Sequence, residues 1–93
     1  MNAILSYDYG PDVLELRTPH RDAHFALVHA AHASGELLLA GPVGEPTPTG
    51  AVLVFTSEQA ASDFAAKDPY VQAGVATAHR VEPMHVVVPA TEG

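Results

Sequence analysis

Stretches with the periodicity of strands and of helices follow one another along this chain in an order that few folds can accommodate. An alternation of apolar and polar positions, or a short apolar run between turn residues, predicts a strand. By these criteria four segments are predicted strands: residues 2–9, 37–40, 51–55 and 77–88. The last of them is expected to be distorted at Pro83, because proline lacks the N–H that pairs a central strand.

The first segment with a helical pattern lies between the first two predicted strands. It begins at about His20 and ends at Ser34-Gly35, where glycine is typical of a helix terminus. One face of this helix is apolar at three- and four-residue spacing and carries His24, Leu27, Val28 and Ala31. Residues 12–19, which precede the helix, have no pattern that assigns them a structure.

The second helical segment lies between the third and fourth strands. Thr56 and Gln59 fit a capping box at its start, and Pro69 is expected to interrupt it. A short helical turn that Gly74 closes can follow the interruption. The residues predicted to be buried on this helix are Ala60, Ala61, Phe64 and Ala65.

This order of elements, strand–helix–strand–strand–helix–strand, is the split βαβ arrangement of ferredoxin-like folds. We therefore expect an α+β protein whose four-stranded antiparallel sheet carries both helices on one face. Residues 37–40, 51–55 and 86–88 are apolar at successive positions, so apolar side chains occupy both faces of the sheet. Because the helices cover only one face, a second copy is the simplest cover for the other, which predicts a homodimer through the sheet faces.

Composition narrows the classes of partner. The 93 residues suffice for one domain, 1–93, and leave no room for a second core. The formal net charge is −7, and the four basic residues form no stripe that could neutralise a nucleic-acid backbone. An anionic membrane surface would repel such a chain, and no apolar stretch approaches the length of a membrane span. With no cysteine and no basic N-terminal leader, the expected location is the cytoplasm.

Several motifs, in this order and spacing, resemble those of the YCII-related (YciI-like) proteins over nearly the whole chain. They are Arg21-x-x-His24, the run Gly35 to Pro42, Asp68-Pro69-Tyr70-Val71, Ala73-Gly74-Val75 and Val81-Glu82-Pro83. The resemblance implies a dimeric α+β barrel with a ferredoxin-like protomer, and a catalytic or ligand-binding His–Asp pair at His24 and Asp68. Relatives include a chlorinated-hydroquinone dehydrochlorinase, muconolactone isomerases and small-molecule monooxygenases. The resemblance thus specifies the fold more closely than the reaction.

His24 and Asp68 each have a structural and a chemical interpretation. For His24, a position at a helix start and burial both disfavour the protonated imidazole, whereas a nearby carboxylate favours it. If these opposing effects roughly cancel, the histidine can act as a general base. The alternative is a core histidine whose ring bonds to a backbone carbonyl. Asp68 precedes Pro69, which is typical of a helix N-cap. Both roles of Asp68 can coexist, because a carboxylate has about four acceptor sites.

Two further residues are candidates for binding a substrate, Arg21 and Tyr70. Arg21 and Arg17 lie at or just before a helix start, where the helix dipole disfavours cations, and this placement suggests binding of an anion such as a carboxylate or phenolate. Surface pairing with Glu15 or Asp22 is the alternative, and it is the one we favour for Arg17. Tyr70 can line a pocket or pack in the core.

The sequence predicts no cofactor and no metal. Two pairs of histidines each share a helix face, His20 with His24 and His29 with His32. A third ligand could come from His79 or His85 further along the chain. A zinc site usually draws on a His-Glu-x-x-His motif or on cysteines, and the chain has neither. It also has no glycine-rich phosphate loop that opens a helix.

Two functions of different class are consistent with these residues. The first is a cofactor-independent enzyme in which His24 moves a proton and Asp68 orients it, for elimination from, or isomerisation of, a small aromatic or lactone metabolite. The second is a non-catalytic dimer that binds a metabolite or a partner protein, with the pair as a polar anchor. A copy that has lost an ancestral activity is a third possibility.

Overall fold

The computed structural model describes residues 1–89, in which four antiparallel strands form one sheet with the strand order β2-β3-β1-β4. The strands are β1 (Asn2–Tyr9), β2 (Leu37–Val43), β3 (Gly50–Phe55) and β4 (Ala76–Met84). The helical segments are α1 (Val13–Leu16), a 3₁₀ turn (Thr18–His20), α2 (Arg21–Ala33), α3 (Glu58–Lys67) and α4 (Pro69–Gln72). In the centre of the sheet, Leu5 of β1 pairs with Leu53 of β3 and with Val81 of β4.

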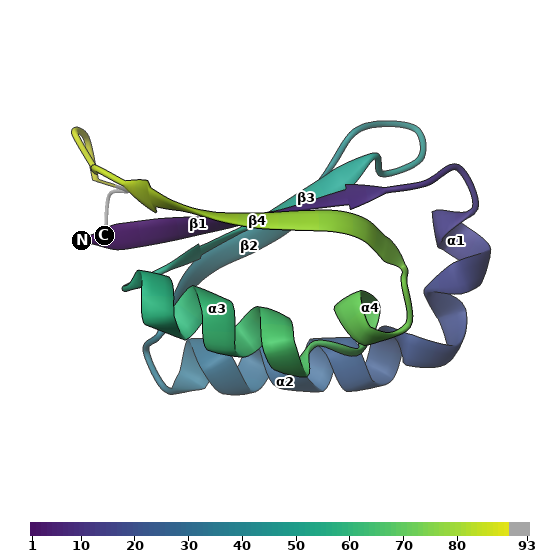
Figure 1. Cartoon of the computed structure of the whole chain (residues 1–93), viewed down its shortest axis with the longest axis horizontal. Helices are drawn as coiled ribbons and strands as arrows, with labels where there is room; N and C mark the ends of the chain where they lie inside the picture. The colour runs from purple at the N-terminus through teal and green to yellow at the C-terminus, as the bar shows by residue number, and fades with distance from the viewer. Residues whose placement is uncertain (90–93) are drawn as a thin grey trace.

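Helices α2, α3 and α4 pack against one face of this sheet, and α1 lies beyond the end of the strands (Figure 1). Successive side chains of a strand point to opposite faces, so every second residue of the central strands enters the core. The core residues from these strands are Ala3, Leu5, Tyr7, Leu53 and Phe55, and the helices add Ala60, Ala61, Phe64, Ala65 and Tyr70. This is the ferredoxin-like α+β architecture that the order of elements predicts.

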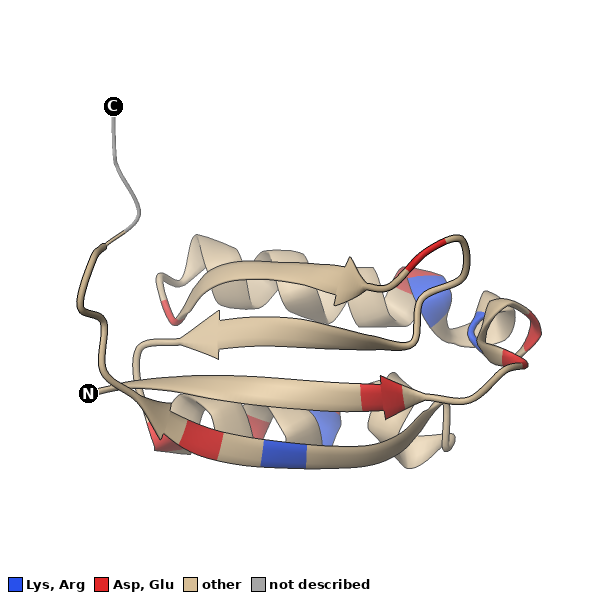
Figure 2. Ribbon diagram, turned by 90° about the horizontal axis from the view of Figure 1, so that it is seen from above, with Lys and Arg blue, Asp and Glu red and all other residues tan. Residues whose placement is uncertain are grey.

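The other face of the sheet carries no helix. Figure 2 looks onto this face: charged residues lie along β1 and β4, whereas β2 and β3 have none. Leu39 and Val43 of β2 are 52% and 50% exposed, and Met84 of β4 is also exposed. The half of the open face formed by β2 and β3 is therefore apolar and uncharged.

Two strand ends differ from the prediction. β2 continues through Gly41 and Pro42 to Val43, because it is an edge strand and proline there interrupts no central ladder. β4 ends at Met84 rather than Val88, because Met84 pairs with Asn2, the first residue of β1. Beyond that pair β1 offers no further residue as a partner.

The predicted capping box is wrong by one residue. Ser57, and not Thr56, is the N-cap of α3, and its hydroxyl accepts a hydrogen bond of 3.1 Å from the N–H of Ala60. Thr56 is still tied to the strand end, since its N–H donates to the carbonyl of Glu36. The side chain of Gln59 donates instead to Asp63, one turn along the helix.

The segment 12–19, which the sequence leaves unassigned, contains α1 and the start of the 3₁₀ turn, and it brings the chain from β1 to the start of α2. Only Val13 of α1 is buried. Within residues 1–89, no helix is both long and apolar enough to cross a membrane.

Candidate active site

Asp68 occupies the break between α3 and α4. Its backbone is extended, and its Oδ1 accepts a hydrogen bond of 3.0 Å from the N–H of Tyr70, while Pro69 takes the first position of α4. This arrangement confirms the N-cap interpretation of the Asp-Pro sequence. The side chain of Asp68 is nevertheless 0% exposed, which is unusual for a cap because a buried carboxylate is costly unless it is well hydrogen-bonded.

Two side chains from distant parts of the chain supply the remaining hydrogen bonds of Asp68. Nδ1 of His24, on α2, lies 2.8 Å from Oδ1 and 3.0 Å from Oδ2. The hydroxyl of Tyr7, on β1, donates to Oδ2 over 2.6 Å. With the N–H of Tyr70, three donors converge on one buried carboxylate. The two roles expected for Asp68, helix cap and partner of His24, therefore coexist in the structure.

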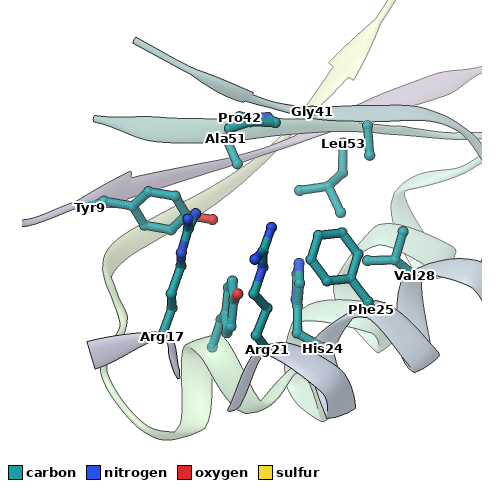
Figure 3. A pocket seen from close by; sticks show the side chains of 12 residues that line it. Tyr9, Arg17, Arg21, His24, Phe25, Val28, Gly41, Pro42, Ala51 and Leu53 are labelled. Carbon is teal, nitrogen blue, oxygen red and sulfur yellow. The ribbon is translucent and has the colours of Figure 1, made fainter. Parts of the chain in front are cut away.

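The hydrogen bond to Asp68 determines which nitrogen of His24 is available. A carboxylate that already accepts from Tyr7 and Tyr70 accepts from Nδ1–H as well, so the neutral ring carries its proton on Nδ1 and leaves Nε2 as an acceptor. Figure 3 shows the tip of His24, where Nε2 lies, directed toward the sheet. The ring of Tyr70 stacks on that of His24 with centroids 3.8 Å apart and planes 4° apart, and Phe25 packs edge-on at 5.3 Å. These contacts hold the imidazole in one orientation.

His24 lines a cavity of about 150 Å³ between the start of α2 and the helix-covered face of the sheet (Figure 3). Its polar lining consists of Tyr9, Arg17, Arg21, His24 and Tyr70, and its apolar lining of Phe25, Val28, Ala40, Gly41, Pro42, Ala51 and Leu53. Asp68 does not line the cavity but lies behind His24. A ligand in this cavity would meet Nε2 of His24 and not the carboxylate.

The structure brings together all four predicted site residues: His24, Arg21 and Tyr70 line the cavity, and Asp68 supports His24. The sequence analysis missed Tyr7 and Tyr9. Their alternation with Leu5 along β1 does place both on the core face, but the strand pattern alone does not reveal what they contact.

The surface pairing favoured for Arg17 is not observed. Arg17 is half-buried in the cavity wall, and within residues 1–89 no ion pair joins it to Glu15 or Asp22. No local signal could have placed Arg17 there, because it lies before α2, between α1 and the 3₁₀ turn, in the segment that the sequence leaves unassigned.

The three tyrosines around the site all have raised pKa values. Burial, and then the hydrogen bond to Asp68 and its charge, raise the pKa of Tyr7 far above its usual value, so Tyr7 remains a donor to the carboxylate. Burial chiefly raises the pKa of Tyr9 to about 12. Burial also raises the pKa of Tyr70, although Arg17 and Arg21 act in the opposite direction. Both tyrosines of the cavity wall are therefore neutral phenols at physiological pH.

Fold and site together define a small ferredoxin-like α+β protein with a buried His–Asp pair beside a cavity. The profile of the YCII-related domain matches residues 1–85, and the chain belongs to this family. YciI of Escherichia coli is 38% identical over 86 residues, which cover 82% of this chain and 88% of the relative. An uncharacterised protein of Haemophilus influenzae is 40% identical over 75 residues, or 70% of this chain and 76% of that protein.

A solved structure with the same fold is that of 5-chloro-2-hydroxyhydroquinone dehydrochlorinase from Burkholderia phenoliruptrix, in complex with 2,5-dihydroxybenzoquinone. It is 26% identical in sequence and superimposes with a TM-score of 0.74, covering 91% of this chain and 94% of that one. An antibiotic biosynthesis monooxygenase shares the fold alone. It is 16% identical and superimposes with a TM-score of 0.56, covering 96% of this chain and 100% of that one.

Proposed function

We propose that the chain is a small-molecule enzyme that moves a proton within its substrate, with Nε2 of His24 as the atom that takes and returns the proton. The observation that carries this proposal is the buried contact of 2.8 Å between Nδ1 of His24 and Asp68, beside a cavity. In such a pair the carboxylate selects the tautomer and stabilises the imidazolium that forms when Nε2 takes a proton. The proposed step uses no cofactor.

Elimination of hydrogen halide from a hydroxylated ring and isomerisation of a lactone share this chemistry. In the elimination, a proton moves from a ring hydroxyl to the carbon that bears the halogen, and the resulting keto tautomer loses a second hydroxyl proton and halide. The net loss is one proton and one halide ion, with no electron gained or lost. In the isomerisation, a proton leaves one carbon and returns to another. One imidazole nitrogen facing the substrate can serve each transfer.

Arg21 and Tyr70 are the residues that we propose to bind the substrate. Both line the cavity, and the stacking of Tyr70 on His24 places the phenol directly beside the imidazole. The dehydrochlorinase of similar fold supports elimination as the reaction class and a hydroxylated ring as the substrate class.

The proposal is tested by incubating the protein anaerobically with 5-chloro-2-hydroxyhydroquinone and measuring released chloride. Exclusion of oxygen is needed because hydroxyhydroquinones oxidise in air. We expect chloride release by the wild type without added cofactor, and none above background by His24→Gln. His32→Gln is the matched control, since His32 is an exposed histidine on the same helix. Equal rates for wild type and His24→Gln, or binding of this compound without turnover, would favour the non-catalytic module.

We also propose that the active form is a homodimer through the open faces of two sheets. The support is the apolar, uncharged half of this face formed by β2 and β3, where Leu39 and Val43 are half-exposed. Leu39→Glu is expected to shift the mass measured by light scattering from dimer to monomer, because the charge would be buried at the interface. Leu14→Glu, at an equally exposed leucine of α1 on the helical side, should remain dimeric. A wild type that is monomeric contradicts this proposal.

A further inference from the structure

The wall of the cavity beside His24 has a charge opposite to that of the whole chain. The chain has 11 acidic and four basic residues. Two of the four basic residues, Arg17 and Arg21, line this cavity, and among residues 1–89 no aspartate or glutamate does. Figure 3 shows both arginine side chains extending from the helical side toward the sheet, on the same side of the cavity as His24. Positive charge is thus concentrated where a ligand would lie.

Neither guanidinium group forms an ion pair with a carboxylate of residues 1–89. Within residues 1–89, the ion pairs are that of His24 with Asp68 and those of Arg80 with Asp8 and Glu82. The guanidinium of Arg21 lies against the ring of Phe25, whose centroid is 5.3 Å from Cζ. Guanidinium offers five N–H donors in a planar fork, and in both arginines these donors remain available to a ligand.

The phenols of the cavity do not offset this charge. The pKa of Tyr9 is raised to about 12 and that of Tyr70 is raised as well, so both keep their protons at neutral pH. Arg17 and Arg21 lie close enough to Tyr70 for their charges to act on its hydroxyl. Both arginines, Tyr70 and His24 line the same cavity, and the ring of Tyr70 stacks on that of His24.

We propose that this cavity selects small planar organic anions. Arg17 and Arg21 together hold an acidic oxygen of the ligand, which is a carboxylate, phenolate or enolate oxygen, and the ring of the ligand lies beside His24. The pairing of guanidinium with an oxyanion is charge-assisted and directional. This inference rests on the proposed function for the location of the site, and it adds the charge of the substrate and the role of Arg17. During proton transfer the same two groups stabilise negative charge that develops on the ring oxygen.

The test is calorimetric titration of the full chain with 2,5-dihydroxybenzoquinone, whose acidic hydroxyls make it an anion at neutral pH, and with neutral hydroquinone. We expect the anion to bind and hydroquinone to bind at least about 10-fold more weakly. Arg17→Gln and Arg21→Gln are each expected to raise the Kd for the anion by about 10-fold or more, as loss of a hydrogen bond to a charged group predicts. The Kd should also rise with salt concentration, because exposed charges are screened.

Arg80→Gln is the matched control, because it removes the same charge from a residue of β4 that does not line the cavity and that pairs with Asp8 and Glu82. It should leave the Kd for the anion within about two-fold. Thermal melts verify that all variants fold, as expected since neither cavity arginine pairs with a carboxylate in the described part of the chain. The inference is overturned if the wild type does not bind the anion, if hydroquinone binds equally well, or if Arg80→Gln weakens binding as much as Arg17→Gln.

This test is independent of turnover. If the anion binds through both arginines but no substrate is converted, the proposed enzyme fails and the anion site stands. If chloride release depends on His24 but not on Arg17 or Arg21, the enzyme stands and the anion site fails.

Discussion

An Asp68→Asn variant is expected to keep its fold and its cavity but to lose about 10²- to 10³-fold in kcat for any substrate that the wild type converts. Asp68 does not line the cavity, so KM should change little. What the substitution removes is the negative charge 2.8 Å from Nδ1 of His24, which stabilises imidazolium while Nε2 holds a proton. The measurement is steady-state kinetics of chloride release, with circular dichroism to verify the fold.

The geometry around Asp68 makes the origin of this loss specific. The N–H of Tyr70 can only donate, so the amide oxygen introduced at position 68 must take the place of Oδ1 and continue to accept from Nδ1–H of His24. The amide nitrogen then faces the hydroxyl of Tyr7, which can rotate to accept. It also takes the place of Oδ2, 3.0 Å from Nδ1, but the amide oxygen at the Oδ1 position is the nearer of the two and the one that can accept from Nδ1–H. Nitrogen NMR of the His24 ring should therefore show the proton still on Nδ1. A loss of activity with this tautomer retained identifies charge as the cause.

Tyr7→Phe is the comparison variant for Asp68→Asn. It removes one hydrogen bond from Oδ2 but leaves the carboxylate charge and the other two donors in place. We expect a decrease in kcat of less than about 10-fold, in line with a positioning role. Full activity of Asp68→Asn would show that the pair only stabilises the fold.

The fold was predictable because its four strands and its two long helices each carry a local signal. Period-two and period-3.6 patterns locate strands and helices, and their order leaves few topologies. The errors in the strand ends lie where pairing between strands, and not local pattern, decides the outcome. Pro42 has the local signal of a strand end but lies on an edge strand, and residues 85–88 have the local signal of a strand but no residue of β1 to pair with.

The site was predictable only in part for the same reason. The helix start before His24 and the Asp-Pro sequence at Asp68 are local signals, and the family resemblance joined them. The bond from Tyr7 to Asp68 connects residues 61 positions apart and exists only because β1 and the α3–α4 break meet in the core. The contribution of Arg17 to the cavity likewise depends on how α1 and the 3₁₀ turn lead the chain into α2, in a segment without a sequence pattern.

Gly50→Ala is expected to destabilise the protein by about 2–4 kcal/mol, measured as the free energy of unfolding in urea. Gly50 begins β3 and pairs with Asp8 of β1. A Cβ at this position would clash with the carbonyl oxygen of Tyr7. That oxygen belongs to the backbone of a central strand, which cannot rotate away as a side chain can. Either β1 or β3 must shift, and both carry core side chains.

Gly41→Ala is the control that separates this clash from a general effect of replacing glycine in the sheet. Gly41 lies on the neighbouring strand β2, and a Cβ there would have no atom within 4 Å. Its effect should remain within about 0.5 kcal/mol. Because the clash at Gly50 is with the residue whose hydroxyl holds Asp68, any folded Gly50→Ala protein should also lose activity beyond its loss of stability. Equal urea midpoints for Gly50→Ala and Gly41→Ala would show that β1 and β3 separate easily. In that case Tyr7 would not be held firmly enough to position the carboxylate of Asp68.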